Sequence, residues 1–403
     1  MLKRFLANNF RSLLNIEFRP AGMNLLVGPN NAGKTNLCSA LRFIGRSSEH
    51  TLDAALLGTI GERWNVTNLF APEAKNLNFE VECELPFRGE MLRFTYSLRL
   101  ESARNASRSD GVGSESVRVV EETLKATGGR FADTILLENR EGRVRMLHEE
   151  GFVKNLPRSP YYVESTTAPN ATMLARLYEL ENNPRAIFFR RYLQSWSYFS
   201  FNPDLLRSPD VARDDGALFS TGANLSRAIF DLHNQKPRLE RKLIDAVRKL
   251  EPKLDLFTFS APDPEHVHLF GEDEKGHRFS TRSMSDGTLR FLAIAYVILM
   301  AGQNAETEGF APLTIIEEPE NGLYVGHLKP LLERIEPDGK LGQFIFTTHN
   351  PYFVDLFDKC LEGVHVIKAG TPSSVLTRPD PATLKQLLDD LTLGELHFHD
   401  MLA

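Results

Sequence analysis

Residues suited to phosphate chemistry lie in the segment "GPNNAGKT", Gly28–Thr35. It fits the pattern G-x-x-x-x-G-K-T and stands between an apolar stretch, "MNLLV", and a helix-like stretch, "NLCSALRFI". The glycines let the backbone curl so that successive N–H groups face phosphate oxygens, and a helix N-terminus adds a favourable dipole. Lys34 would neutralise the β- and γ-phosphates, and the hydroxyl of Thr35 would ligate Mg²⁺. An ordinary glycine turn is the alternative, but the strand and helix stand where a phosphate loop needs them.

Two adjacent acids end an apolar stretch in "LTIIEEPENGL", Leu313–Leu323. A phosphate-loop enzyme needs such a strand, because one acid can hold the water shell of Mg²⁺ while the next polarises the attacking water. We expect Glu317 in the metal role and Glu318 as the general base. A solvated strand end explains one acid easily, and two adjacent acids less easily.

A third strand-like stretch, "QFIFTTHNPYF" (Gln343–Phe353), carries a histidine at its end. His349 could hydrogen-bond a γ-phosphate or the attacking water. A single histidine at a strand end is more often structural. The evidence for a functional role of His349 is its position in the chain, after the phosphate loop and the paired acids.

The stretch "SMSDGTLRFLAIAYVIL", Ser283–Leu299, runs from small polar residues into a long apolar segment. It predicts a helix that starts near Gly287, is capped by Ser285 or Asp286, and buries its apolar residues in the core. A helix cap needs only one such residue, so capping alone does not explain why several small polar residues precede the helix.

The elements that must position these residues alternate between helix and strand in the C-terminal third, which indicates an α/β fold. The first thirty residues predict three short strands, and a helix follows over 33–44. Residues 45–76 are interpreted as loop-rich, and alternating apolar residues beyond them predict antiparallel strands. We therefore expect three parts: the phosphate loop with a β lobe over 1–170, a helical insertion over 171–250, and the acids, histidine and Ser285 over 251–403.

Composition narrows the possible function classes. The longest apolar runs are about half of what a bilayer span requires, so we expect no membrane partner. Three widely separated cysteines give neither a disulfide framework nor metal-ligand spacing, and they fit a cytoplasmic protein. The net charge of −6 does not indicate a nucleic-acid binder. The basic segment Lys236–Leu250 is interpreted as a solvated helix face rather than a DNA patch.

Two histidine-containing clusters could hold a metal. They are "HVH" (His266, His268) and "HFHD" (His397, His399, Asp400). On a strand, residues i and i+2 point the same way, so the geometry is possible. Without a third ligand at suitable spacing, a structural role is the stronger interpretation.

The order of these motifs resembles the ATPase heads of the ABC superfamily, in the branch of SMC and RecF proteins and the ATPase half of OLD-type nucleases. The opening "NNFRSLLNIEFRP", the "SDGTLR" in place of the transporter signature, "EPENGL" and the closing "LTLGELHFHDML" all resemble that branch. The resemblance covers roughly residues 1–46 and 221–403. It implies an α/β P-loop NTPase head with an antiparallel β lobe and an inserted helical subdomain.

The resemblance also implies roles for individual residues. Glu317 and Glu318 correspond to the Walker B pair, and His349 to the switch histidine. Ser285 and Gly287 would face the γ-phosphate of an ATP bound to a second subunit, because such heads work as head-to-tail dimers. Asn321 and Gly322 would lie in the loop that crosses the dimer interface. ATP and Mg²⁺ would be held by Gly28, Asn30, Asn31, Ala32, Gly33, Lys34, Thr35 and Asn36.

Three departures from the family pattern bear on activity. The first Walker B acid is normally Asp, and the longer Glu317 must shift the water-mediated Mg²⁺ contact. No glutamine occurs between Thr35 and Gln194, so the usual Q-loop residue is missing, and Asn68 is the candidate substitute. Asp286 replaces a glycine of the signature, and its carboxylate would repel a γ-phosphate unless the side chain turns away, for example into a cap.

The family resemblance leaves the output of ATP binding open. SMC coiled coils need sustained heptads that the insertion lacks, and because the sequence reaches Ala403 directly after the head, we expect no TOPRIM nuclease domain. We expect a stand-alone ATPase whose nucleotide-gated dimer or higher oligomer controls a separately encoded DNA-acting or toxic effector, such as a nuclease, in prokaryotic antiphage defence. A RecF-like DNA-repair ATPase that clamps DNA, or a slow-hydrolysing ATP-switched scaffold, are the alternatives.

Overall fold

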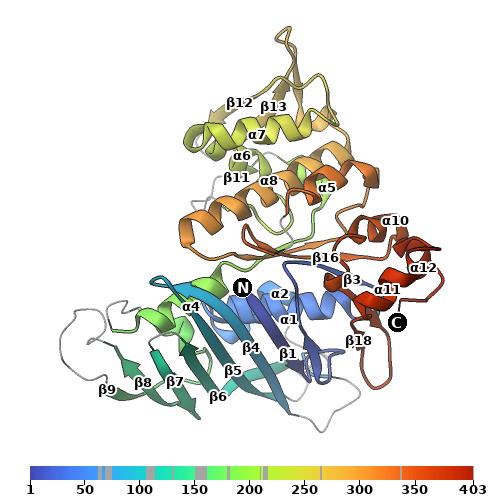
Figure 1. The fold of residues 1–403 in the computed structure, drawn as a ribbon. Helices are drawn as coiled ribbons and strands as arrows, with labels where there is room; N and C mark the ends of the chain where they lie inside the picture. Colours follow the sequence, from blue (N-terminus) through green and yellow to red (C-terminus); the bar gives the residue numbers. More distant parts are fainter. Residues whose placement is uncertain are drawn as a thin grey trace. The chain divides into compact units, whose positions relative to one another are not determined.

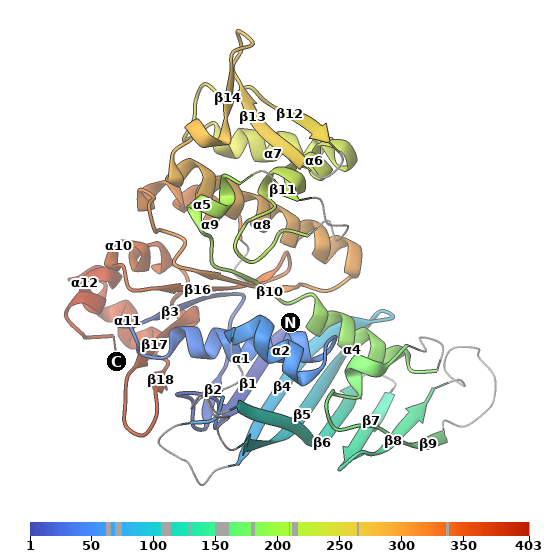
Figure 2. The ribbon, with the colours of Figure 1, turned by 180° about the vertical axis from the view of Figure 1, so that it is seen from behind.

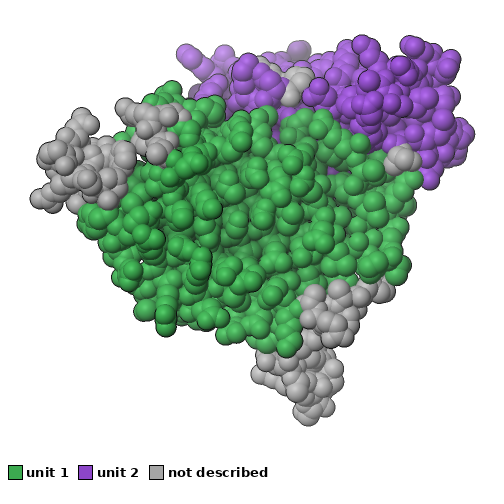
Figure 3. All heavy atoms as spheres, turned by 60° about the horizontal axis from the view of Figure 1, so that its bottom comes forward, with its two compact units in different colours: residues 1–21, 28–196, 365–378 green, residues 22–27, 197–364, 379–403 purple. Residues whose placement is uncertain are grey.

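The computed structural model describes residues 1–61, 66–68, 75–105, 114–128, 131–149, 161–178, 182–208, 210–211, 217–263, 266–335 and 338–402. These residues fall into two compact units, coloured separately in Figure 3. Unit 1 comprises residues 1–21, 28–196 and 365–378, and unit 2 comprises residues 22–27, 197–364 and 379–403. The three-part division expected from the sequence stays a prediction.

Unit 1 is built on an antiparallel sheet, drawn in blue to teal in Figure 1. Residues alternate between buried and more exposed along β4, so one face of the sheet carries the apolar side chains. The strand order is β2-β1-β4-β5-β6-β7-β8-β9. The strands are β1 (Leu2–Asn8), β2 (Ile16–Phe18), β4 (Asn76–Phe87), β5 (Glu90–Asn105), β6 (Ser114–Gly128), β7 (Phe131–Arg140), β8 (Arg143–His148) and β9 (Tyr161–Thr166).

Three helices pack against this sheet: α1 (Lys34–Ser47), α2 (Leu52–Ile60) and α4 (Pro184–Gln194). The rings of Phe10, Phe43 and Phe79 meet between α1 and the sheet, with centroids about 6 Å apart. A hairpin of β17 (Val364–Lys368) and β18 (Val375–Thr377) provides the late segment of unit 1. The unit therefore joins the start of the chain to a segment near its end.

Unit 2 contains parallel strands in the order β10-β15-β16-β3. They are β10 (Ser197–Phe199), β15 (Leu313–Glu317), β16 (Gln343–Thr348) and β3 (Met23–Val27). All residues of β3 and β16 are buried, as expected for central strands of a parallel sheet. The short helices α9 (Lys329–Leu332), α10 (Pro351–Val354), α11 (Pro381–Leu387) and α12 (Leu393–Phe398) follow these strands in the chain.

The long helix α8 (Asp286–Glu308) is the core helix of unit 2. Among the described helices it is the one with the length and apolarity to cross a membrane, but 72% of its apolar window is buried. Against it pack α5 (Pro203–Leu206) and α7 (Pro237–Val247), and α6 (Leu225–Gln235) packs against α7. Figure 2 shows the small sheet beside α6, made of β11 (Asp210–Val211), β13 (His266–Glu272), β12 (Leu256–Asp263) and β14 (Arg278–Ser280).

Several sequence predictions of local structure were wrong. The segment interpreted as loop-rich contains α2, which Thr51 caps by accepting a hydrogen bond from the N–H of Ala54. The stretch 171–180, expected to be helical, has only a 3₁₀ turn over Leu174–Arg176 among its described residues. The expected helical insertion also contains the strands β10 and β11.

Candidate functional site

The phosphate loop lies in unit 1 and has the backbone that its glycines were expected to provide. Gly28 and Gly33 have φ angles of 154° and 110°, and Asn31 has a φ of 63°. A Cβ on Gly28 would lie 2.0 Å from the carbonyl oxygen of Ile367, and one on Gly33 would lie 2.3 Å from Oγ of Ser374. Only glycine fits at both positions.

Lys34 begins α1, and its side chain is bound inside this loop. Its Nζ donates hydrogen bonds to the carbonyl oxygens of Gly28 at 2.6 Å and Pro29 at 3.0 Å. No side chain caps α1 at Gly33, so the first turn of the helix has no competing side-chain acceptor at its positive end. Ammonium, backbone curl and helix N-terminus together suit a bound phosphate group.

Three polar side chains outside Gly28–Thr35 are hydrogen-bonded to one another, and two of them, Ser12 and Ser374, lie next to Gly33. Ser12 Oγ accepts a hydrogen bond from Nδ2 of Asn36 at 2.7 Å and another from Oγ of Ser374 at 2.8 Å. Asn36, expected at the nucleotide, therefore connects the first turn of α1 to Ser12 in this structure. Of the other predicted loop residues, Ala32 is buried, whereas Asn30, Asn31 and Thr35 are exposed.

The predicted acids and histidine share one edge of the parallel sheet in unit 2. Since β3, β15 and β16 run parallel, their carboxyl ends meet at that edge. Glu317 pairs in register with Thr347, and Thr348 pairs with Val27. The phosphate loop begins at the residue that follows Val27 in the chain.

Glu318 and His349 are in contact at this edge. Nδ1 of His349 lies 3.2 Å from Oε1 of Glu318, and Nδ2 of Asn321 donates to Oε2 of Glu318 at 2.6 Å. Glu318 has a φ of 43°, a left-handed conformation that costs a residue other than glycine about 1–3 kcal/mol. Its N–H donates to the carbonyl of Thr347 at 3.0 Å, so the neighbouring strand holds this strained backbone. The carboxylate remains about one-third exposed, which leaves it accessible to a water molecule.

Glu317 has a partner that the sequence did not indicate. The hydroxyl of Tyr198, on β10, donates a hydrogen bond of 2.7 Å to Oε2 of Glu317. The two residues lie on neighbouring strands of the parallel sheet. Tyr198 lies within residues 171–250, which the sequence interpretation assigned to a helical insertion, so no sequence signal pointed to this contact.

Glu320 is a second acid that sequence reasoning did not single out. It is 3% exposed, and its Oε1 accepts a hydrogen bond from Oγ1 of Thr348. The same Oγ1 accepts from the N–H of Asn350 at 2.9 Å, so Glu320 and Thr348 brace the backbone on both sides of His349. Burial raises the pKa of the Glu320 carboxyl above its ordinary value.

The turn before α8 shows which of its residues caps the helix. Oγ of Ser285 accepts a hydrogen bond of 3.0 Å from the N–H of Thr288, so Ser285 is the N-cap. Asp286, whose side chain was expected to turn into a cap, forms an ion pair with Arg207 instead. Ser285 is exposed, and Gly287 is buried where a Cβ would lie 2.7 Å from the carbonyl oxygen of Gly322.

Arg290 connects this helix to the catalytic candidate Glu318. It is 8% exposed, and its guanidinium donates to the carbonyl oxygens of Glu318 at 3.3 Å and Phe201 at 3.0 Å. Burial lowers the pKa of the guanidinium, and the acids nearby oppose that shift. The sequence motif "SDGTLR" includes this residue but gives no indication of its partner.

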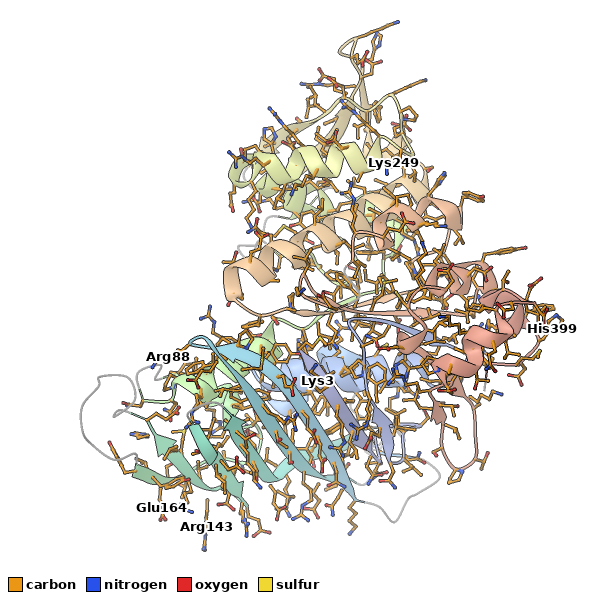
Figure 4. The ribbon with its side chains drawn as sticks, in the orientation of Figure 1. Lys3, Arg88, Arg143, Glu164, Lys249 and His399 are labelled. Atoms are coloured by element: carbon orange, nitrogen blue, oxygen red, sulfur yellow. The ribbon has the colours of Figure 1, made fainter. Side chains whose placement is uncertain are left out.

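The weaker candidates take no part in these arrangements. Asn68 is buried in unit 1, where its side chain contacts the carbonyl of Pro372 at 3.4 Å and its N–H donates to Asn9. Over the described part of the chain, no group of three or more His, Cys, Asp or Glu side chains could hold a metal ion. His399 lies at the surface just after α12 (Figure 4).

The chain was compared with known protein families, curated proteins and solved structures. Residues 23–355 match the family model AAA_21, described as "AAA domain, putative AbiEii toxin, Type IV TA system". No curated protein matches the sequence.

Solved structures of SMC heads are similar to this chain. An SMC head bound to the C-terminal winged-helix domain of ScpA is 13% identical, with a TM-score of 0.52, over 95% of this chain and 99% of that one. The SMC head of Thermotoga maritima is 13% identical, with a TM-score of 0.43, over 94% and 99% of the two chains. An SMC head with an extended coiled coil from Pyrococcus furiosus, bound to the C-terminal domain of ScpA, is 12% identical, with a TM-score of 0.47, over 96% and 98%. The first of these shows that the fold is that of an SMC-like P-loop ATPase head, as the sequence predicted.

Proposed function

Since this chain belongs to the AAA_21 family of SMC-like ATPase heads, we propose that it binds ATP with Mg²⁺ and hydrolyses it to ADP and phosphate. The observation that carries the proposal is the contact between Glu318 and His349 at the carboxyl ends of β15 and β16. A carboxylate that is partly exposed and oriented by an imidazole and an amide is suited to polarise a water molecule.

The remaining predicted residues would bind the nucleotide. Lys34 would move from the carbonyls of the loop to the β- and γ-phosphates, and the backbone N–H groups of Asn30–Gly33 would face phosphate oxygens. The hydroxyl of Thr35 and the carboxylate of Glu317 are oxygen ligands of the kind Mg²⁺ prefers, and the ion would neutralise phosphate charge when bound. The exposed Thr35 and the uncapped start of α1 support this assignment.

We propose further that the active form is a dimer gated by the nucleotide. Ser285 is exposed at the positive N-terminus of α8, a position suited to the γ-phosphate of an ATP held by a second copy of the chain. The ion pair of Asp286 with Arg207 supports this role, because it directs the carboxylate away from the approaching anion. The closed dimer would control a separately encoded effector, such as a nuclease, in prokaryotic antiphage defence. This last step is supported by the family description, which names a toxin of a toxin–antitoxin system.

A slow, ATP-switched scaffold is the second candidate function. The observation that favours it is the hydrogen bond from Tyr198 to Glu317, which occupies one oxygen of the acid expected at the metal. In such a scaffold ATP closes the dimer, hydrolysis is slow, and the effector provides the remaining chemistry.

Phosphate release by the purified full chain with Mg²⁺ and ATP separates the two candidates. We expect steady turnover that Glu318→Gln abolishes and that Glu362→Gln, the same change at an exposed carboxylate, leaves unchanged. Dimerisation with ATP but without turnover would replace the ATPase by the scaffold. Turnover that survives in Glu318→Gln would remove Glu318 as the general base.

A further inference from the structure

A cavity of about 740 Å³ opens in unit 2 between the start of α7, the C-terminal half of α8 and the residues that lead into β16. Its volume is within the range of about 300–1,000 Å³ that small-molecule sites occupy. The proposed ATPase does not use it. Phe344 on its wall lies roughly 16 Å along the strand from His349. Gly302 lies roughly 25 Å along α8 from Ser285.

The floor of this cavity is apolar. Leu341 is 38% exposed there, although it is a large aliphatic residue. A Cβ on Gly302 would meet only the Cβ of Leu341, at 3.9 Å, so the glycine leaves room above the helix. The apolar side chains that line the cavity are Leu239, Ile298, Leu299, Ile335, Leu341 and Phe344.

Four cations also line the cavity. Lys236, Arg238 and Lys242 come from the start of α7, and Arg334 comes from the segment after α9. None of the four forms an ion pair with any residue that the structure describes. One carboxylate, that of Glu306, also lines the cavity. The cations therefore outnumber the acids, and an anionic ligand would be attracted.

We propose that this cavity binds a small organic anion. An apolar body would cover the floor formed by α8 and the start of β16, and a carboxylate, sulfonate or phosphate group would face the cations of α7. A nucleic-acid backbone would use the cations alone and leave the recessed apolar floor uncovered, so the chemistry of the floor favours the small ligand. The site is independent of the nucleotide and goes beyond the proposed ATPase.

The fluorescent probe 1-anilinonaphthalene-8-sulfonate has this chemistry, with an aromatic body and one sulfonate. Titrated into the folded full chain without nucleotide, it is expected to bind at one saturable site. Its uncharged analogue N-phenyl-1-naphthylamine should bind at least about tenfold more weakly, which corresponds to about 1.4 kcal/mol. Equal affinity for the two probes would contradict the anionic part of the proposal.

Three variants test where the probe binds. Gly302→Phe places a bulky side chain in part of the cavity without a change of charge, and Arg238→Glu with Lys242→Glu reverses two of the cations that line it. Each should weaken probe binding at least about tenfold. The matched control is Arg241→Glu with Lys249→Glu, which makes the same charge change on cations outside the cavity, one of them beyond the end of α7 (Figure 4). This control should keep the wild-type affinity.

The outcomes decide the proposal in either direction. Probe binding that is unchanged in Gly302→Phe, or weakened as much by the control pair as by the cavity pair, would overturn it. A DNA duplex that binds wild type and Gly302→Phe equally, but not Arg238→Glu with Lys242→Glu, would assign the cations to nucleic acid and also overturn it. Far-UV circular dichroism confirms folding, and Gly302→Leu provides a smaller filling if the phenylalanine variant does not fold.

Discussion

Replacing Arg290 by methionine tests whether this residue positions Glu318, the proposed general base. Methionine has a similar length and no charge, so it keeps the packing of α8 and removes both hydrogen bonds to carbonyl oxygens. A buried carbonyl left without its partner costs about 1–3 kcal/mol. The bond to Phe201 is well formed at 3.0 Å, whereas the bond to Glu318 is long at 3.3 Å.

The net effect on stability follows from these opposing contributions. Loss of the two bonds destabilises the fold, but removal of a buried guanidinium recovers part of its desolvation free energy. We expect the free energy of unfolding to fall by about 2 kcal/mol. The loss in turnover should be larger than this destabilisation explains, because the strained backbone of Glu318 loses one of its anchors.

The assay combines chemical unfolding, followed by far-UV circular dichroism, with phosphate release at saturating ATP. In Arg290→Met, kcat should fall at least about tenfold with little change in KM, since a positioning residue acts on the reacting geometry rather than on nucleotide binding. Arg290→Lys should be intermediate, because lysine keeps the charge but lacks the fork that reaches two carbonyls. The matched control is Arg282→Met, the same substitution at an exposed site in the turn before α8. If Arg290→Met retained both the unfolding midpoint and kcat of the wild type, the positioning argument would be refuted.

Two further predictions concern Ser285, in the turn before α8, and the buried acid Glu320. Ser285→Asp keeps an N-cap oxygen and Ser285→Arg does not, so only the arginine variant should lose about 1 kcal/mol of stability. Both variants should nevertheless abolish ATP-dependent dimerisation, measured by sedimentation velocity. ATP-dependent dimers of both variants would return Ser285 to a purely structural role. Glu320→Gln should be more stable than the wild type above neutral pH. Burial raises the folded-state pKa of the Glu320 carboxyl, so protonation of this carboxyl stabilises the fold. That contribution is complete below about pH 4.5 and is lost as the pH rises through the raised pKa. Thermal unfolding from pH 4.5 to 8 should show the stability difference between Glu320→Gln and the wild type growing with pH, and a constant difference would contradict the raised pKa of Glu320.

The motifs that ligand chemistry constrains could be predicted from the sequence. The phosphate loop requires glycine at fixed positions, and Gly28 and Gly33 have the close contacts that account for this requirement. The strand that ends in Glu317 and Glu318 was also recognisable, because its apolar run predicts a buried strand and the two adjacent acids mark the point where that strand leaves the core. Both signals are local, so a single sequence contains them.

Contacts across the fold could not be predicted, because their partners are far apart in the chain. Tyr198 and Glu317 meet only because β10 and β15 pair. The helix expected near Met173 was replaced by a 3₁₀ turn, where the buried carboxylate of Glu122 accepts hydrogen bonds from the N–H groups of Met173 and Leu174. The carboxylate of Glu122 therefore caps this turn although it is distant in the sequence, and no local sequence pattern predicts such a contact.

In the turn at the start of α8, which contains Ser285 and Gly287, the local packing of a motif residue has to be considered before its role in ligand binding. Gly287 matches the family pattern, but its close approach to the carbonyl of Gly322 would require glycine in an isolated subunit as well. The presence of glycine is therefore weak evidence for a nucleotide at this turn. Ser285 is different, because Asp would cap α8 equally well, whereas the neutral hydroxyl of Ser285 adds no negative charge that would repel a phosphate at the helix N-terminus. The exposed Ser285, rather than Gly287, is the residue on which the dimer proposal depends.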